Sequence, residues 1–132
     1  GVETYQGHGV FWIGEKSGQG LQIYLWAEET LNIDFIFQLA AGGGLPSPQR
    51  SLFFGHWIVS PYLELPKLMS NQPYQLNGEG KATFTVELQP GLNKLILYCT
   101  DEATIRSQPN GDKRPLMVLV NRVDVVPKAA RP

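Results

Sequence analysis

The segment 31–39 reads Leu31-Asn32-Ile33-Asp34-Phe35-Ile36-Phe37-Gln38-Leu39. Its odd-numbered residues are all apolar, whereas three of its four even-numbered residues are polar. Because successive side chains of a β-strand point to opposite faces, this spacing predicts a strand with one buried face, and a helix does not produce it. The same period of two runs through 81–88, so both segments are interpreted as half-buried antiparallel strands.

Other parts of the chain are apolar on both faces and bounded by Gly, Pro, Asn or Ser, which favours strands over helices. These runs are 10–13, 21–26, 52–59, 92–99 and 116–126, and a shorter strand is expected at 74–76. About eight strands at such spacing predict an all-β fold, an antiparallel β-sandwich or jelly roll. Helix is expected to be limited to a turn or two, near 28–31 or near Leu68. The predicted core includes Phe35, Phe37, Phe84, Val86, Leu95, Leu97, Val118 and Val120.

Composition narrows the class of protein. The 132 residues fit one domain, and we expect residues 1–132 to be a single β-sandwich cut from a larger protein, with 127–132 as a linker-like tail. The net charge is −1 and the basic residues are scattered, which argues against a nucleic-acid partner. No apolar run reaches the roughly 20 residues of a membrane span, so no membrane insertion is expected. The single cysteine, Cys99, lies among apolar residues and is interpreted as a small buried hydrophobe.

Turn and strand signatures in the last third of the chain carry a resemblance to a known class of domain. They are Pro90, Gly91, Asn93, Leu95, Leu97, Gly111, Asp112, Arg114, Leu116, Val118, Val120, Val123 and Val125. The pattern resembles galactose-binding-like β-sandwiches, the class of many carbohydrate-binding modules appended to bacterial glycosyltransferases and glycoside hydrolases. Upstream, the segment 11–14, the strand 31–39 and the loop ending at Arg50 are also similar to those domains.

The resemblance implies an extracellular or cell-envelope module of bacteria that is accessory to a glycan-active enzyme. Its expected partners are a polysaccharide or oligosaccharide and a neighbouring catalytic domain. A structural calcium ion is compatible with the resemblance, with Glu15 or Glu3 paired with Asp124, but the flanking pattern of calcium-binding relatives is not reproduced. No other cofactor is expected.

Sugar recognition needs aromatic faces that stack on a pyranose, with polar side chains to bind its hydroxyls. The candidate ligand-binding residues are therefore Trp12, Trp26, Trp57, Tyr62 and Tyr74, together with Asp112 and Arg114. Packing in the core is the alternative for each tryptophan. Asp112 and Arg114, just after a Pro-Asn-Gly turn, are expected either to bind sugar hydroxyls or to pair with each other or with Arg106 and fix the loop 100–110.

Catalytic patterns are weak in this sequence. His8 and His56 are far apart and lack metal-ligand spacing, no pair of carboxylates is singled out for glycosidase chemistry, and no nucleophile elbow is present. We therefore expect a non-catalytic module. The alternatives are a purely structural sandwich that packs against a catalytic domain and, third, a small metal-dependent enzyme.

Overall fold

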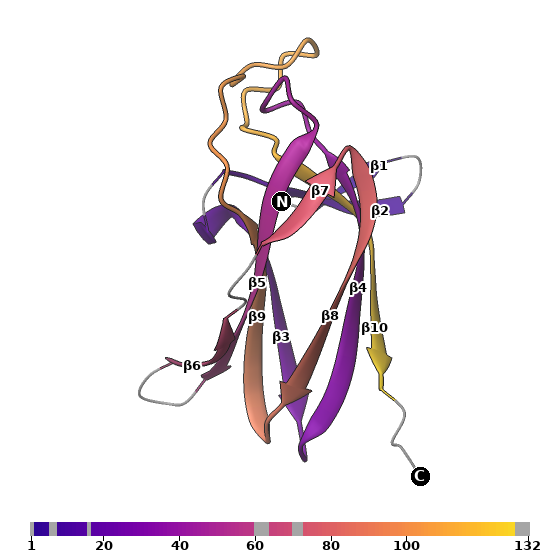
Figure 1. Cartoon of the computed structure of the whole chain (residues 1–132), viewed down its shortest axis with the longest axis vertical. Coiled ribbons are helices and arrows are strands. Elements are labelled where there is room, and N and C mark those ends of the chain that lie inside the picture. The colour runs from indigo at the N-terminus through magenta and orange to yellow at the C-terminus, as the bar shows by residue number, and fades with distance from the viewer. Residues whose placement is uncertain (1, 6–7, 16, 60–63, 70–72, 129–132) are drawn as a thin grey trace.

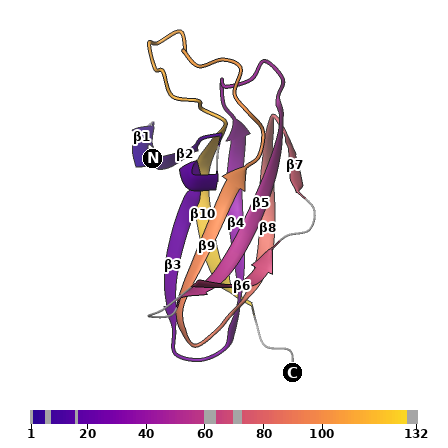
Figure 2. The same cartoon turned by 90° about the vertical axis from the view of Figure 1, so that its left-hand side faces the viewer.

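A computed structural model describes residues 2–5, 8–15, 17–59, 64–69 and 73–128 of the chain. These residues form two antiparallel β-sheets that pack face to face, which is an all-β sandwich of the jelly-roll class (Figures 1 and 2). The strands are β1 (Val2–Tyr5), β2 (His8–Ile13), β3 (Leu21–Ala27), β4 (Leu31–Ala41), β5 (Gln49–Val59), β6 (Glu64–Met69), β7 (Tyr74–Asn77), β8 (Glu79–Leu88), β9 (Gly91–Cys99) and β10 (Val118–Pro127). One short 3₁₀ turn, η1 (Ser17–Gln19), precedes β3.

The two sheets have different strand orders. Sheet A has the order β1-β2-β10-β4-β8, and sheet B has the order β3-β9-β5-β6, with β7 also paired to β5. The long segments 42–48 and 100–117 gather at one end of the sandwich, and the tight turns β3–β4 and β8–β9 lie at the other end (Figure 1). The two ends are called the loop end and the turn end below.

Each strand predicted from the sequence is present, and two more are added. The strands β1 and β6 were not predicted, and the expected helical turn near Leu68 is wrong because Leu68 lies in β6, paired with His56. The expected turn of helix at 28–31 is also wrong: residues 28–30 are a bend and Leu31 begins β4. β1 and β6 lie at the edges of their sheets. An edge strand is joined to its one neighbour by backbone hydrogen bonds, so its side chains need not alternate between apolar and polar residues.

The core lies between the sheets and confirms the expected alternation. Phe35 and Phe37 of β4 are fully buried, and Phe54 of β5 packs against both rings, at 5.3 and 5.5 Å between centroids. Phe84 stacks on Phe54 at 4.9 Å but remains partly exposed at the side of the sandwich. The other predicted core residues are buried: Val86, Leu95, Leu97, Val118 and Val120.

Cys99 is buried, as predicted. Burial raises the pKa of its thiol to about 11; the backbone of Asp101 opposes this by hydrogen bonding, whereas the Asp101 carboxylate, which accepts from the thiol at 3.5 Å, raises the pKa further. The thiol therefore stays protonated near neutral pH, and a protonated, enclosed thiol is a poor nucleophile. Among the described residues no helix is long and apolar enough to cross a lipid bilayer.

Arg50 is the largest side chain in the interior, with only 1 % of its surface exposed. Its Nε donates to the carbonyl oxygen of Met117 at 2.9 Å, and its Nη2 donates to that of Gly42 at 2.6 Å. Its Nη1 donates to the carbonyl oxygens of Ser47 at 2.5 Å and Gln49 at 2.7 Å. One side chain thus binds the segment 42–49 to the residue that precedes β10.

Replacing Phe35 by alanine removes a fully buried ring and should lower the free energy of unfolding by about 3 to 5 kcal/mol. Leu31→Ala is the matched control on the same strand, because Leu31 is exposed at its end, and it should cost less than about 1 kcal/mol. Urea denaturation followed by far-ultraviolet circular dichroism measures both. Equal losses in the two variants would contradict the core described above.

Arg50→Met keeps the length of the side chain but removes this donor from four buried or half-buried carbonyl oxygens, of which that of Met117 keeps a second donor in the backbone N–H of Gly42. We expect it to lower the free energy of unfolding by about 3 kcal/mol or more, since bonds to charged groups are worth roughly 1.5 to 3 kcal/mol each before the surroundings relax. Arg50→Lys should fall between Arg50→Met and the parent protein, because an ammonium cannot reach the same fork of acceptors. A stability of Arg50→Met within about 1 kcal/mol of the parent would contradict this role.

Candidate functional site

The outer face of sheet B carries exposed aromatic rings. In β3, Ile23 and Leu25 face the core while Tyr24 and Trp26 face solvent, with exposed fractions of 52 % and 68 %. Alternation along the strand places the two exposed rings on the same face, about 7 Å apart along the backbone. Large side chains left in water in this way are a common mark of a binding surface.

Register extends this aromatic surface across the neighbouring strands. Tyr24 pairs with Lys94 of β9, and Lys94 pairs with Trp57 of β5. The Nζ of Lys94 lies 5.9 Å from the centre of the Trp57 ring, within the range of a cation–π contact. We call Tyr24, Trp26, Trp57 and Lys94 the sheet-B platform. Since neighbouring strands are about 4.8 Å apart, the row from Tyr24 to Trp57 spans roughly 10 Å.

The same face continues towards the loop end of the sandwich. Phe53 and Tyr98 are paired across β5 and β9, and their rings stack at 5.8 Å with 19° between planes. Between this stack and the platform lie Gly55 and Ile96, which pair with each other. The outer face of sheet B is therefore largely apolar, with aromatic rings at intervals and the buried Gly55 and Ile96 between them.

A buried polar pair supports the platform from inside. The Nε2 of His56 lies 2.8 Å from the Oδ1 of Asn93, and this oxygen also accepts a hydrogen bond from the backbone of Gln89 at 3.0 Å. The Nδ2 of Asn93 donates to the carbonyl oxygens of Gln89 at 2.8 Å and Gly91 at 3.1 Å. Asn93 thereby fixes the turn before β9, where Gly91 has a positive φ of 105° that favours glycine. β9, the central strand of the platform, therefore starts at a corner held by side-chain hydrogen bonds, where β3 and β5 end.

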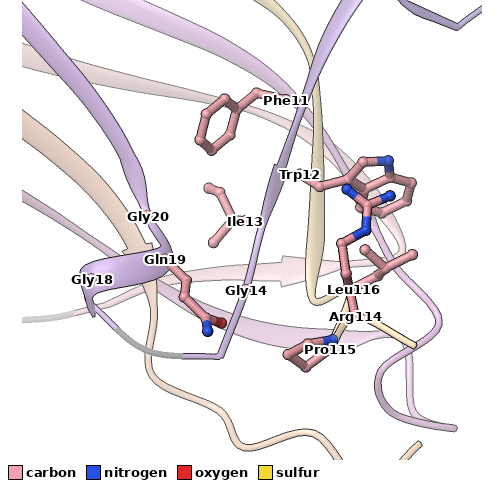
Figure 3. A pocket seen from close by; sticks show the side chains of 10 residues that line it. All are labelled: Phe11, Trp12, Ile13, Gly14, Gly18, Gln19, Gly20, Arg114, Pro115 and Leu116. Carbon is pink, nitrogen blue, oxygen red and sulfur yellow. The ribbon is translucent and has the colours of Figure 1, made fainter. Parts of the chain in front are cut away.

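A second concave surface lies at the loop end. A pocket of about 300 Å³ opens between β2, η1 and the segment 114–116 (Figure 3). Trp12, Arg114 and Leu116 lie on one side of the view, and Gly18 and Gln19 lie on the other. The pocket therefore combines apolar walls with a few polar groups.

Arg114, at this pocket, is held by Asp112. Its Nε and Nη2 donate to the carboxylate at 3.0 and 2.6 Å, and its backbone N–H donates to the same group at 2.9 Å. These bonds hold the pKa of Asp112 at about 2, well below the usual value. Because the folded pKa is the lower one, the pair stabilises the fold above about pH 4, and this contribution is lost as the pH falls through 2.

The loop 100–110 is fixed by other residues. Glu15 accepts hydrogen bonds from both Nη atoms of Arg106, at 2.6 and 2.9 Å, and from the backbone N–H of Ala103 at 3.0 Å. The backbone N–H groups of Thr104 and Ile105 both donate to the carbonyl oxygen of Gly44. The side chain of Asp112 binds Arg114 instead, which is the mutual pairing that the sequence left open.

The predicted ligand-binding residues are thus divided. Trp26 and Trp57 lie together on the sheet-B platform, and Trp12 and Arg114 lie together at the pocket. Tyr74 is at neither surface, because its ring packs against Phe84 at 6.5 Å and its hydroxyl lies 3.4 Å from the carbonyl oxygen of Lys81. Tyr62 lies outside the described residues.

Two platform residues were not predicted from the sequence. Tyr24 lies in a run that is apolar at nearly every position, so neither face was marked as exposed. The available signal was the order of side chains in β3, where aliphatic residues occupy the odd positions and Gln22, Tyr24 and Trp26 occupy the even ones. Lys94 is identified only through its pairing with Tyr24 and Trp57 across three strands.

Two of the carboxylates named for a calcium site are engaged in ion pairs. Glu15 binds Arg106 at the loop end, and Asp124 binds Arg122 in β10 at 3.0 Å. The side chain of Glu3 is outside the described part of the structure. Among the described residues no group of three or more His, Cys, Asp or Glu side chains is placed to hold a metal ion. Glu15 and Asp124 thus bind separate arginines.

No protein-family model and no curated protein sequence matches the chain. Among solved structures, it is similar to one described as "CBM4 structure and function", with TM-score 0.61 and 11 % identity over 97 % of this chain and 76 % of that chain. It is also similar to the CBM22-1 xylan-binding domain of Paenibacillus barcinonensis Xyn10C, with TM-score 0.64 and 14 % identity over 97 % and 78 %.

A third similar structure is the GH26-CBM35 β-(1,4)-mannanase of Podospora anserina, with TM-score 0.53 and 14 % identity. The match covers 98 % of this chain but 23 % of the mannanase chain. At such identities the likeness is one of fold. The chain therefore has the β-sandwich fold of carbohydrate-binding modules.

Removing Arg114 should release the carboxylate of Asp112. In Arg114→Ala the pKa of Asp112 should rise from about 2 towards the usual value near 3.9, stopping short of it because the backbone N–H of residue 114 still donates. Carbon-detected NMR of the carboxyl group against pH measures this, with Arg122→Ala as the matched control that leaves Asp112 unchanged. An unchanged pKa in Arg114→Ala would show that another group holds Asp112.

Proposed function

We propose that the protein is a non-catalytic carbohydrate-binding module that binds a polysaccharide or oligosaccharide on the outer face of sheet B. The observation that carries this proposal is the exposure of Tyr24 and Trp26 side by side on one strand, in register with Lys94 and Trp57. Pyranose rings have an apolar C–H face that stacks on such rings, and an aromatic ring offers a large apolar area to this contact.

The form of the platform favours an extended glycan over a small buried ligand. Its rings lie on a sheet surface and not in a deep cavity, and the row spans roughly 10 Å, which is more than one sugar ring. The Phe53–Tyr98 stack continues the aromatic surface towards the loop end. A chain of several units is thereby able to lie across β3, β9 and β5.

The electrostatics support binding without catalysis. Glycoside hydrolysis uses a pair of carboxyl groups, one with a raised pKa so that it acts as an acid near neutral pH. Here the pKa of Asp112 is lowered to about 2, and Glu15, Asp112 and Asp124 each bind an arginine. These carboxylates hold loops and strands together.

The wider role follows from the kind of protein that shares the fold. One similar structure is described as a xylan-binding domain, and another is a mannanase with a CBM35. We therefore infer an accessory module of a glycan-active enzyme, acting outside the cell beside a catalytic domain, with xylan and mannan as the first glycans to be tested. Bacterial origin is part of the same proposal and rests on the sequence resemblance alone.

Affinity electrophoresis tests the binding surface. The chain should be retarded in native gels that contain soluble xylan, galactomannan or mixed-linkage β-glucan, and Trp26→Ala should weaken the retarding interaction by about tenfold or more, the loss expected from one stacked ring of a hot spot. Tyr24→Ala should weaken it less, because a smaller and less exposed ring is removed.

Val126→Ala is the matched control, since it removes an exposed apolar side chain from sheet A. The melting temperature of all three variants should stay near that of the parent, because none of these side chains lies in the core. If no soluble glycan retards the chain and pull-down on insoluble xylan, mannan and cellulose also fails, the platform is a packing surface for a neighbouring domain.

A further inference from the structure

The strand β3 forms one edge of sheet B. Among the described residues it pairs with β9 alone, over all seven residues from Leu21 to Ala27 and without a bulge. Figure 2 shows β3 at the margin of the sandwich, below β1 and β2. Alternate residues of an edge strand point their N–H and C=O groups away from the neighbouring strand, so roughly half of these groups in β3 face the open side. A further strand is able to pair with them.

The sequence of β3 lacks the features by which edge strands avoid pairing with other chains. Those features are charged side chains, proline, bulges and short length. The strand reads LQIYLWA and has no charged residue and no proline. The other edge strands carry one or more of these features: β1 and β7 have four residues each, β6 contains Pro66 and Lys67, β8 contains Glu79, Lys81 and Glu87, and the part of β10 beyond its pairing with β2 contains Arg122, Asp124 and Pro127.

Apolar side chains are left partly exposed along the same side of the sandwich. Leu21, Ile23 and Leu25 of β3 pack against the core but are only half-buried. Across from them, Val125 of β10 pairs with the buried Phe35 and so faces the interior, yet it leaves 44 % of its surface in water. The side between β3 and β10 is therefore both apolar and open.

The composition of β3 suits antiparallel pairing with a second copy of itself. When two such strands are related by a twofold axis beside Tyr24, all seven residues of each strand have a partner. On the inner face Ile23 is then opposite Leu25, and on the outer face Trp26 is opposite Gln22. Tyr24 is opposite its own counterpart, and no like charges meet anywhere along the pair.

The other edge strands are poorer partners for β3. Pairing with β8 or β10 of a second copy places charged side chains such as Lys81 or Asp124 opposite uncharged ones. It also leaves β3 of that copy open, so that further copies can add without limit. Pairing of β3 with itself closes both edges at once and ends the assembly at two chains.

We propose that β3 is a dimer interface, at which two copies of the chain pair their β3 strands antiparallel about Tyr24 and join their B sheets into one. Seven residues of strand are about 23 Å long, and a sandwich with its outer side chains is roughly 20 Å deep. The contact thus covers about 900 Å² in total, close to the lower limit of about 1,000 Å² for specific interfaces. The dimer is accordingly weak and reversible, with a dissociation constant on the order of 100 µM.

The dimer joins two sheet-B platforms. Residues directly opposite each other in an antiparallel pair point to the same face, so the platforms of both copies lie on one side of the joined sheet. The row from Trp57 of one copy to Trp57 of the other crosses five strand spacings, or roughly 24 Å. The interface is argued without the proposed function, but together the two make a bivalent binding surface.

Sedimentation velocity of the whole chain, from about 5 to about 500 µM, tests the self-association, because this range spans the expected dissociation constant. The weight-average mass should rise reversibly from that of one chain towards that of two, without larger species. A chain that remains single at the highest concentration overturns the proposal.

Opposite charges at Tyr24 test the pairing itself. Tyr24→Lys and Tyr24→Glu each place like charges opposite each other at the centre of the interface, and each should weaken self-association by about tenfold or more. An equimolar mixture of the two variants should recover a dimer, since the introduced ammonium then faces the introduced carboxylate. Tyr24 is 52 % exposed, so both variants should fold, and the recovery itself shows that they do. If the single variants associate like the parent, or if the mixture does not associate, the pairing about Tyr24 is wrong.

Two controls separate edge pairing from other contacts. Thr83→Lys adds the same charge at an exposed position of the edge strand β8 and should leave self-association unchanged. Trp57→Ala removes a platform ring two strands away from the β3 edge and should also leave it unchanged. If Trp57→Ala weakens association as much as Tyr24→Lys does, the two platforms meet face to face and the edge interface is overturned.

The outcomes for the interface and for the proposed function are independent. A chain that stays single but is retarded by soluble glycan retains the proposed function and loses the interface. A chain that associates through β3 but binds no glycan retains the interface and loses the proposed function.

Discussion

The buried guanidinium of Arg50 is the constraint on which the loop end depends. The segment 42–48 contains three glycines and two prolines, so it cannot pair as a strand, and its carbonyl oxygens need other donors. Arg50 supplies donors to the carbonyl oxygens of Gly42 and Ser47 and reaches Met117 as well, while backbone N–H groups serve those of Gly44 and Pro48. Burial lowers the pKa of Arg50, although the nearby Asp101 opposes this effect, and the group stays charged because arginine titrates so far above neutral pH. The buried guanidinium thus provides hydrogen bonds that a paired strand would otherwise provide to this segment.

This constraint also positions the pocket. Gly42 and Gly44 donate backbone hydrogen bonds to Met117 and Leu116, so the loop that Arg50 holds is joined to the segment that carries Arg114. A Cβ on Gly42 would lie 2.8 Å from the indole of Trp12, which shows how closely this loop packs against that ring. The loop end is therefore rigid by hydrogen bonding, whereas the platform is rigid because it lies on paired strands.

Much of the fold follows from the sequence, because alternation in 31–39 and 81–88 reports burial directly. The edge strand β6 was missed: Glu64, Pro66 and Lys67 interrupt any apolar pattern, and its pairing with β5 comes from the backbone. The site was harder to predict. Trp26 and Trp57 come to the same face only through the register of β3, β9 and β5. Whether a tryptophan faces the core or solvent depends on whether it falls at an odd or an even position of its strand, and the sequence does not mark this where both faces of the strand are apolar.

The exposure of the platform rings argues for a role in binding and against a role in stabilising the domain. Trp26 leaves 68 % of its surface in water, and Tyr24 leaves 52 %, so neither contributes much to the hydrophobic free energy of folding. The residues that hold the sandwich together lie elsewhere: the phenylalanine cluster around Phe54, the Arg50 network and the Asn93 corner. A domain that needed these rings for its own stability would bury them. Rings left in water are available to a partner outside the domain, and their row across β3, β9 and β5 matches the long, repetitive ligand that the proposed function requires.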